Sequence, residues 1–490
     1  MQLIQLNKEP NINPKYKAFP YQDEAVKSIC DLEYAAVFHE QGLGKSKIAI
    51  DVMLYWLEKK YIDTVIFVVK RSLINNWLKE LSIGSFIKPR IISQNRRVNH
   101  FVFNSPSRVL VTHYEAIKTE KERFKLFLKT RNVAVILDEA TKIKNPDSDL
   151  TKAFFELAPL FKKRIIMTGL PVANRPYDIW SQIFFLDKGE SLGISFNDFK
   201  KQADFNDALS YSIDEQNNFE GFLSKIFLKI SKFSVRETKN SGVITLPDKI
   251  FENIITSWES RQLDLYSQVK DDFKAIVIKE GLPKEDEADA VLKRLLRLVQ
   301  IASNPKLIDD SYSVEPGKYP YLYELVLNIC NKKEKCIVWT TFTDNADALS
   351  EFLKPFGTCK VHGKLGMESR NNAIEDFLNN SKKRVLVATT GAAKEGLTLT
   401  VANHAIFYDR SFSLDDYSQA QDRIHRISQG KNCYVYNLIM EDSIDQWVDA
   451  LLRAKHLAAK LTQGDISQEY FRSQISYGFI DIIKDILNIK

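Results

Sequence analysis

The chain has 490 residues, which is too long for one compact core, so two or three domains are expected. Its 44% hydrophobic and 27% charged residues exclude a largely disordered protein, and no apolar run is long enough to span a bilayer. The five scattered cysteines indicate neither a zinc site nor a disulfide framework. The cysteine pattern, together with the absence of a signal-peptide pattern, predicts that the protein works in the reducing cytoplasm. The net charge of +6 is mild, and a solvated lysine-rich surface explains it as well as nucleic-acid binding does.

Residues 35–50 read as a buried strand, a glycine-containing turn and the start of a helix. This order is typical of a P-loop, in which the backbone N–H groups of a glycine turn and the helix N-terminus hold phosphates. The candidate nucleotide-binding residues are Gly42, Leu43, Gly44, Lys45 and Ser46, with Lys45 on the terminal phosphates and Ser46 on magnesium. His39 occupies a position where the strict pattern has glycine, so an ordinary strand–turn–helix stays open for this stretch alone.

Just upstream, Phe19-Pro20-Tyr21-Gln22 precedes a helical pattern. An aromatic ring and a glutamine here could stack on and hydrogen-bond an adenine, but a proline helix start with a packing aromatic explains them equally well.

Further apolar runs at 64–69, 109–112, 133–137 and 164–167 alternate with helical patterns, which predicts a parallel sheet covered by helices on both faces. Asp138-Glu139 follows the third run directly. Two carboxylates at a strand end beside a P-loop suit ATP hydrolysis, one orienting magnesium and the other polarising the attacking water. The polar segments that follow the other predicted strands lie at the sheet edge where open α/β sheets bind ligands. For the segment after 164–167, an ordinary turn without a ligand is the alternative interpretation.

The second half repeats this alternation without a P-loop. Helical, charged patterns at about 187–240 and 255–310 read as insertions, the boundary between lobes is expected at 240/241, and 443–490 reads as C-terminal helices of the second lobe. Near the end, Gln419, Arg423 and Arg426 fall at i, i+4 and i+7, so one helix face would carry them. Arginines on that face would stabilise charge that develops in phosphoryl transfer, whereas a surface salt-bridge helix would not need the glutamine.

Taken in order, these motifs resemble those of Swi/Snf-type ATPases, a double-stranded-DNA translocase branch of helicase superfamily two. The stretch from His39 to Ser46 resembles Asp-Glu-Met-Gly-Leu-Gly-Lys-Thr, and the stretch from Gln419 to Gln429 resembles Gln-Ala-x-Asp-Arg-x-His-Arg-Ile-Gly-Gln. Thr168-Gly169-Leu170-Pro171 with Asn174 resembles Thr-Gly-Thr-Pro-x-x-Asn. The resemblance implies an α/β fold of two RecA-like parallel-sheet lobes, residues 1–240 and 241–490, with helical insertions and a C-terminal helical extension.

The resemblance also implies ATP and Mg²⁺ as cofactors. Gln22 would read the adenine, Asp138 would position magnesium, and Glu139 would activate the hydrolytic water. Arg423 and Arg426 would act as arginine fingers beside Gln419, and Gly396 is a further nucleotide candidate. The implied partner is duplex or branched DNA, bound through its backbone largely without sequence preference. The candidate DNA-binding residues are Lys70, Ser72, Trp77, Thr112, Asn174, Thr341, His362, Thr390 and Lys394.

Two departures refine the expectation. Thr141 replaces the usual histidine of the second motif, and residues 391–400 lack the Ala-Gly-Gly-x-Gly of chromatin remodellers, looking more like fork-remodelling and annealing members. Little of the chain lies outside the motor, which predicts a bacterial or viral origin. The protein is also expected to be monomeric and cytoplasmic, with no membrane partner. The expected function is an ATP-driven motor that moves DNA branches or reverses forks. A motor acting on a nucleoprotein such as a stalled polymerase, or in phage–host conflict, and a scaffold with an inactive ATPase fold are the alternatives.

Overall fold

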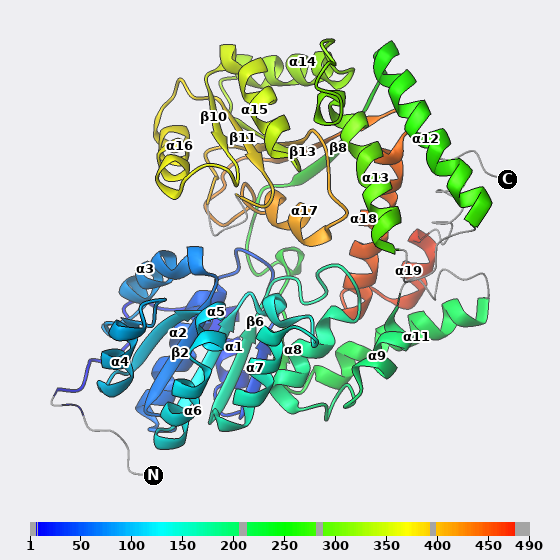
Figure 1. Ribbon diagram of the computed structural model, residues 1–490. Coiled ribbons are helices and arrows are strands. Elements are labelled where there is room, and N and C mark those ends of the chain that lie inside the picture. Colours follow the sequence, from blue (N-terminus) through cyan, green and yellow to red (C-terminus); the bar gives the residue numbers. More distant parts are fainter. Residues whose placement is uncertain (1–5, 7, 205–212, 281–287, 393–397, 476–490) are drawn as a thin grey trace. The chain divides into compact units, whose positions relative to one another are not determined.

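The computed structural model describes the whole chain except residues 1–5, 7, 205–212, 281–287, 393–397 and 476–490 (Figure 1). The chain divides into two compact units. Unit 1 combines Met1–Thr245 with Leu457–Gln474, and unit 2 contains Leu246–His456. Each unit has its own parallel sheet, as the α/β prediction required. Among the described residues, none of the helices has both the length and the apolar character that a membrane crossing needs.

Unit 1 is built on a sheet whose described strands are ordered β3-β4-β2-β5-β6-β1-β7 and pair in parallel. The central strands are continuous apolar runs; β2, for example, is buried along its whole length because helices cover both faces of the sheet (Figure 1). The strands are β1 (Tyr34–Val37), β2 (Thr64–Val69), β3 (Arg90–Ile91), β4 (Val109–His113), β5 (Val133–Asp138), β6 (Lys163–Met167) and β7 (Ser234–Val235).

The helices of unit 1 follow the strands in alternation and then continue as a helical insertion. They are α1 (Pro20–Ile29), α2 (Lys45–Glu58), α3 (Ile74–Gly84), α4 (Arg96–Asn104), α5 (Tyr114–Thr119), α6 (Lys121–Thr130), α7 (Asp149–Leu157), α8 (Asp178–Asp187), α9 (Phe196–Ala203), α11 (Ile213–Ile230) and α19 (Gln468–Gln474). Short 3₁₀ helices are η1 (Arg71–Leu73), η2 (Ala140–Ile143), η3 (Ala158–Leu160) and η4 (Lys239–Ser241).

Unit 2 has a second parallel sheet, with its described strands ordered β10-β11-β9-β12-β13-β8. The strands are β8 (Lys249–Thr256), β9 (Cys336–Thr340), β10 (Thr358–Val361), β11 (Val385–Thr389), β12 (His404–Phe407) and β13 (Cys433–Met440). The helices are α12 (Ser260–Glu280), α13 (Ala288–Ser303), α14 (Lys318–Asn331), α15 (Thr343–Phe352), α16 (Met367–Asn379), α17 (Leu414–Gln421) and α18 (Ile444–Thr462), with η6 (Pro305–Leu307) and η7 (Lys354–Phe356) as 3₁₀ turns.

Two strands appear where the sequence predicted helices or a lobe junction. β7 lies inside the predicted insertion 187–240, and β8 extends into the start of the predicted insertion 255–310. Both are edge strands that gain their partners from distant parts of the chain, β7 from β1 and β8 from β13. Since most of β8 is exposed, it lacks the buried apolar run by which strands are recognised in a sequence.

The predicted domain limits also need a correction at the C-terminus. Residues 443–490 were assigned to the second lobe, but Leu457–Gln474 belongs to unit 1, and the first boundary lies at 245/246. Helix α18 begins in unit 2 and ends in unit 1. Within unit 1, Arg472 pairs with the buried Glu220 of α11, and Phe227 of the same helix lies against Gly464. These contacts are between residues more than two hundred positions apart, so local patterns could not reveal them.

Candidate nucleotide and nucleic-acid sites

The P-loop connects the end of β1 to the first residue of α2. Its turn contains Gly42 at φ 89° and Gly44 at φ 72°, a left-handed backbone that glycine adopts without steric cost. A Cβ at Gly44 would lie 2.2 Å from Nε2 of Gln22, so the turn also needs glycine for space. Helix α2 starts at Lys45, and the unpaired N–H groups of a helix N-terminus form a natural site for phosphate.

Lys45 lies at the centre of this loop. Its ammonium donates to the carbonyl oxygens of His39 (2.9 Å) and Glu40 (3.3 Å). Because β6 pairs in parallel with β1, the turn after β6 approaches the P-loop. A Cβ at Gly169 would lie 3.0 Å from the backbone nitrogen of Gln41 and 3.3 Å from Nζ of Lys45. The Thr-Gly turn, which the sequence also allowed as an ordinary turn, is therefore packed against Lys45, the candidate phosphate-binding lysine.

The two candidate carboxylates follow the apolar run of β5, which lies between β2 and β6 in the sheet. Asp138 accepts a 2.7 Å hydrogen bond at Oδ2 from the indole N–H of Trp77. Burial of the carboxylate among neighbouring protein atoms, followed by the charge of Glu139, raises the pKa of Asp138 above its ordinary range, although Trp77 and Lys45 act in the opposite direction. Burial and the neighbouring Glu139 thus make the negative charge of Asp138 harder to keep than that of an exposed aspartate.

Glu139 has a left-handed backbone, with φ 56° and ψ 56°. A residue with a side chain rarely adopts this conformation, and such strain, of order 1 kcal/mol or more, is concentrated at functional sites. The conformation turns the chain directly from β5 into η2, so the two adjacent carboxylates are carried by different backbone geometries. This suits the separate roles that the sequence predicts for them.

The residues at this strand edge suit Mg²⁺ bound together with a nucleotide. Magnesium usually takes one or two protein oxygens and completes its shell with phosphate and water. Ser46 in the first turn of α2 and Asp138 at the end of β5 offer a hydroxyl and a carboxylate. The described part of the chain contains no group of three or more His, Cys, Asp or Glu side chains that would hold a metal alone. The donor set therefore fits a magnesium–nucleotide complex rather than a free-standing metal site.

Gln22 has its amide turned onto the P-loop. It is 3% exposed, its Nε2 donates to the carbonyl of Leu43 (3.3 Å) and the hydroxyl of Tyr21 (3.3 Å), and its Oε1 accepts from the N–H of Phe19 (3.1 Å). In this structure Gln22 therefore supports the loop, and its predicted contact with adenine stays a prediction.

The candidate DNA-binding residues lie near the carboxyl ends of strands, as predicted, but their exposure differs. Four of them are partly exposed residues at strand-end turns, namely Lys70, Ser72, Asn174 and Thr341, although the hydroxyl oxygens of Ser72 and Thr341 are buried. Lys394 lies outside the described residues, as does the nucleotide candidate Gly396.

Four other candidates are buried, and the prediction that their side chains contact DNA has to be corrected. Trp77 is 2% exposed and gives its N–H to Asp138. Thr112 is fully buried within β4 and donates to the carbonyl of Ile92 (3.1 Å). His362 is 2% exposed with Nε2 3.1 Å from Asp347, and Thr390 is 8% exposed. Their motifs mark the right strand ends, but alternation along the strand or helix turns these side chains inward.

The arginine motif does not form the single helix face that its spacing predicted. Helix α17 ends at Gln421, and Arg423 and Arg426 lie in the turns that follow. After Gln421 the N–H groups of Arg423 and Ile424 bond carbonyls only three residues back, so the α-helical pattern ends, and the carbonyl of Arg423 accepts from the N–H of Leu399 (3.0 Å). Gln419 is buried and donates to Asp415 (2.6 Å), whereas Arg426 donates to Thr398 (2.8 Å) and keeps some exposure.

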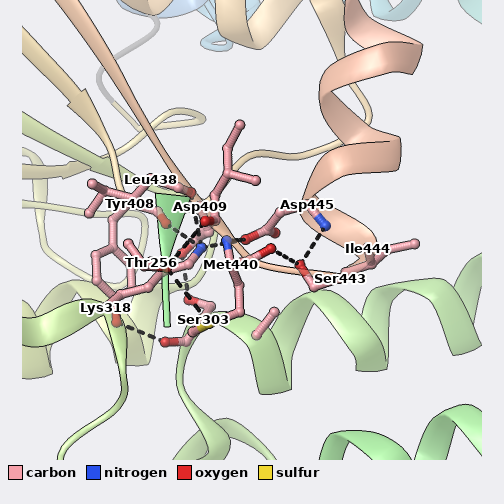
Figure 2. Close-up of polar contacts among 12 residues, drawn as sticks. Thr256, Ser303, Lys318, Tyr408, Asp409, Leu438, Met440, Ser443, Ile444 and Asp445 are labelled. Carbon is pink, nitrogen blue, oxygen red and sulfur yellow. Dashed lines mark hydrogen bonds and ion pairs between the residues drawn. The ribbon is translucent and has the colours of Figure 1, made fainter. Parts of the chain in front are cut away.

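Sequence reasoning missed a buried carboxylate that organises a predicted DNA-contact turn in unit 2. Asp409, which follows β12, accepts from the hydroxyls of Ser303 (2.8 Å) and Thr340 (2.6 Å) and from the N–H of Thr341 (2.6 Å) (Figure 2). It connects the end of α13 with the turn after β9. A polar residue directly after a buried strand was the signal that could have found it.

Close to Asp409 lies a fully buried ion pair. Lys318 of α14 donates to Asp445 of α18 (2.6 Å) and to the carbonyls of Tyr408 (3.0 Å) and Leu438 (3.1 Å) (Figure 2). A buried charge must be paired and fully hydrogen-bonded, and Lys318 meets this requirement with three acceptors. The pair joins α14, α18, β13 and the residue that follows β12 at one point of unit 2.

Comparison with known proteins agrees with the order of motifs. The SNF2-related domain matches residues 21–307, more than half of the chain, and the helicase conserved C-terminal domain matches residues 317–428. The uncharacterized ATP-dependent helicase MG018 of Mycoplasma genitalium is 29% identical over 90% of this chain and 42% of its own length. The ISWI chromatin-remodeling complex ATPase ISW1 of Saccharomyces cerevisiae is 24% identical over 95% of this chain and 43% of its own length.

The chain thus spans less than half the length of these curated relatives. Among solved structures, the Sulfolobus solfataricus SWI2/SNF2 ATPase core in complex with dsDNA is 24% identical, covers 97% of this chain and 99% of that chain, and has a TM-score of 0.43. With the SNF2-related domain over most of its first 307 residues and the helicase C-terminal domain after it, this chain belongs to the SNF2-related family.

Proposed function

We propose that this chain is a DNA-dependent ATPase that uses ATP hydrolysis to move along duplex DNA. The observation that carries the proposal is the joint placement of Lys45, Gly169 and the Asp138-Glu139 pair at the carboxyl edge of one sheet. This edge is where open α/β sheets bind ligands. Membership of the SNF2-related family and the presence of a helicase C-terminal domain support the same activity.

Each residue of unit 1 has a role that its chemistry suits. Lys45 would exchange its two backbone acceptors for phosphate oxygens and balance their charge. Glu139 would orient the attacking water and take its proton. Ser46 and Asp138 would hold Mg²⁺, which supplies positive charge to the phosphates during transfer. Arg423 and Arg426 of unit 2 are proposed to add the cationic groups that a phosphoryl-transfer transition state needs beyond Lys45.

The proposed DNA contacts are made by polar groups at strand-end turns. Lys70 and Asn174 of unit 1 are partly exposed and are of the residue types that bind phosphate oxygens. Ser72 and Thr341 lie in turns of the same kind, where backbone N–H groups can also bind phosphate, although their hydroxyl oxygens are buried. Contacts of this kind position a protein on the backbone without reading bases. Binding should therefore depend strongly on salt and little on sequence.

At a finer level, we propose that the motor remodels branched DNA by moving branches or reversing forks. The reason is the stretch 391–400, which differs from the corresponding motif of chromatin remodellers. A second candidate, displacement of a nucleoprotein complex such as a stalled polymerase, rests on the same motor. We place the protein in the cytoplasm of a bacterial or phage-infected cell.

The decisive experiment measures ATP turnover without DNA and with single-stranded, duplex and forked DNA. Turnover stimulated by duplex or forked DNA is expected, and turnover that ignores DNA would contradict the translocase proposal. A synthetic four-way junction then tests the finer proposal. Branch migration supports it, whereas displacement of a polymerase from duplex DNA without branch migration favours the second candidate.

A further inference from the structure

Asp138 is held from two sides by buried aromatic residues. The indole N–H of Trp77 donates to its side-chain oxygen Oδ2 (2.7 Å), and the hydroxyl of Tyr114 donates to its backbone carbonyl (2.7 Å). One bond fixes the carboxylate. The other fixes the peptide group that leads into the left-handed Glu139.

The two donors come from neighbouring strand ends. Trp77 is in the first turn of α3, which follows β2 and the turn that contains Lys70 and Ser72. Tyr114 is the first residue of α5, directly after β4. Because β4, β2 and β5 are adjacent in the sheet, both aromatic residues reach the end of β5 from the side of the turn that contains Lys70 and Ser72, whereas Asn174 follows β6 on the other side.

Both donors are fixed in the core and cannot reach DNA themselves. Trp77 is 2% exposed and packs on Phe67 of β2 with ring centroids 4.9 Å apart. Tyr114 is fully buried and packs on Phe154 of α7 at 5.5 Å. If the turns that follow β2 and β4 are displaced, Trp77 and Tyr114 should move Asp138 with them, because both side chains are rigidly packed.

The bond of Trp77 differs from those of the other tryptophans. A buried indole needs an acceptor, and a structural tryptophan usually finds a backbone carbonyl nearby. Trp56, Trp180 and Trp258 do so, on the carbonyls of Cys30, Gly193 and Glu441. The indole nitrogens of the remaining two, Trp339 and Trp447, are buried with no partner in the described structure. Among the six tryptophans, all in described parts of the chain, Trp77 is the one that donates to a carboxylate, and that carboxylate is the candidate magnesium ligand.

We infer that Trp77 and Tyr114 are positioning residues that connect the DNA-facing turns of unit 1 to the carboxylates Asp138 and Glu139. By occupying Oδ2, Trp77 sets the orientation in which the other carboxylate oxygen is presented to the magnesium–nucleotide complex. Tyr114 holds the backbone from which Glu139 projects. The inference rests on the proposed function, since it explains how DNA bound at those turns would stimulate hydrolysis.

The test uses variants of the full chain that remove one donor each. Trp77→Phe keeps an aromatic ring on Phe67 but loses the N–H, and Tyr114→Phe loses only the hydroxyl. Trp56→Phe is the matched control for the first, because Trp56 is equally buried in unit 1 and bonds a carbonyl away from the site. Tyr55→Phe, which removes a hydroxyl that donates to Asp31 (2.9 Å), is the control for the second.

Two readouts separate positioning from folding. The first is equilibrium binding of a fluorescent ATP analogue with and without Mg²⁺, in the absence of DNA. The affinity gained from Mg²⁺ should fall several-fold in Trp77→Phe and stay unchanged in Trp56→Phe. The second is the ratio of ATP turnover with and without duplex DNA, which should fall about tenfold in Trp77→Phe and Tyr114→Phe but not in the controls.

Values equal to those of the controls in both readouts would overturn the inference. If Trp77→Phe unfolds at a clearly lower temperature than Trp56→Phe, its effects could come from lost stability. The test then rests on Tyr114→Phe and its ratio of ATP turnover with and without duplex DNA. Absence of DNA stimulation in the unaltered protein would instead contradict the proposed function. The magnesium dependence of nucleotide binding would still show whether Trp77 positions Asp138.

Discussion

Arg236 and Asp465 are 229 residues apart in the sequence and form a two-point ion pair within unit 1, with Nε and Nη2 of the arginine 2.6 Å and 2.5 Å from the two carboxylate oxygens. The remaining Nη1 of Arg236 donates to the carbonyl of Phe38 (2.7 Å), the residue that follows β1 and precedes the P-loop. The pair therefore fastens the C-terminal segment to the strand that leads into the nucleotide site.

This pair predicts that Arg236→Lys destabilises unit 1. Lysine keeps the charge but cannot bridge two carboxylate oxygens and a carbonyl, so partly buried acceptors lose partners. The free energy of unfolding should fall by about 2 kcal/mol. Denaturant unfolding measures this, with Arg96→Lys as control because Arg96 is 72% exposed and 4.0 Å from Glu120. Equal unfolding curves for the two variants would show that the pair adds nothing.

Lys45→Ala and Glu139→Gln should each reduce ATP turnover at least a thousandfold, for different reasons. The first removes the cation on the phosphates and should also weaken nucleotide binding. The second keeps the shape of the side chain and should leave binding within a few-fold. Steady-state turnover and binding of a fluorescent ATP analogue separate the two effects. Lys59→Ala, at the exposed C-terminal end of α2, is the control. Turnover that survives in either variant would remove that residue from the proposed site.

Gly169→Ala should disturb the P-loop although Gly169 lies outside it. The added Cβ would lie 2.9 Å from Cγ of Gln41 and 3.0 Å from its backbone nitrogen, closer than such contacts normally allow. We expect affinity for the ATP analogue to fall about tenfold or more. Gly221→Ala is the matched control, since nothing lies within 4 Å of a Cβ built there. An unchanged affinity would mean that the loop adapts at no cost.

His39 predicts a pH dependence of stability. Its ring is 2% exposed and stacks on Tyr21. Burial first, then the charge of Lys45 and more weakly that of Arg236, lowers its pKa to about 4 against an opposing effect of Glu237. The folded state therefore keeps the ring neutral. The contribution to stability is full above the unfolded pKa near 6.5 and is lost as the pH falls from there towards 4.

When the pH is lowered from 7 to 5, titration of His39 should reduce the free energy of unfolding by about 2 kcal/mol. His39→Gln keeps a buried polar side chain but cannot titrate, so the variant should lose that much less stability over the same interval. Urea unfolding at the two pH values gives the difference. Parallel losses in the variant and the unaltered protein would contradict a neutral, buried His39.

Arg426→Ala should abolish ATP turnover while leaving the affinity for the ATP analogue within a few-fold. The reason is that an arginine acting on the transition state stabilises charge that the ground state lacks. Lys382→Ala, an exposed residue of unit 2 far along the chain, is the control. Retained turnover would leave Arg426 with a structural role through its bond to Thr398.

Several features of the fold could be predicted because short segments encode them. The P-loop turn, the buried run of β2 and the Asp138-Glu139 pair at the end of β5 are each local patterns, with glycine at left-handed positions or a continuous apolar run. Such patterns depend on a few consecutive residues and on the backbone geometry that these residues permit.

Other features arise only when distant segments pack together. Trp77 carries the residue type of a DNA-contact motif, but its N–H bonds Asp138 because β2, the strand that leads into α3, lies beside β5 in the sheet. Arg423 and Arg426 have helical spacing, but α17 ends at Gln421, and in the turns that follow the carbonyl of Arg423 accepts from the N–H of Leu399 instead of from the next helical turn. In both cases a contact between distant segments outweighs the local tendency.

By itself, then, the sequence determined the alternation of strands and helices, the glycine turn of the P-loop and the placement of the candidate carboxylates Asp138 and Glu139 at a strand end. The tertiary structure alone decided which polar side chains are buried, which aromatic residues hold Asp138, and that Leu457–Gln474 completes unit 1 through Arg236 and Asp465. The physical reason is that backbone preferences act over a few residues. Burial and hydrogen-bond partners are set by segments that meet only in the folded chain.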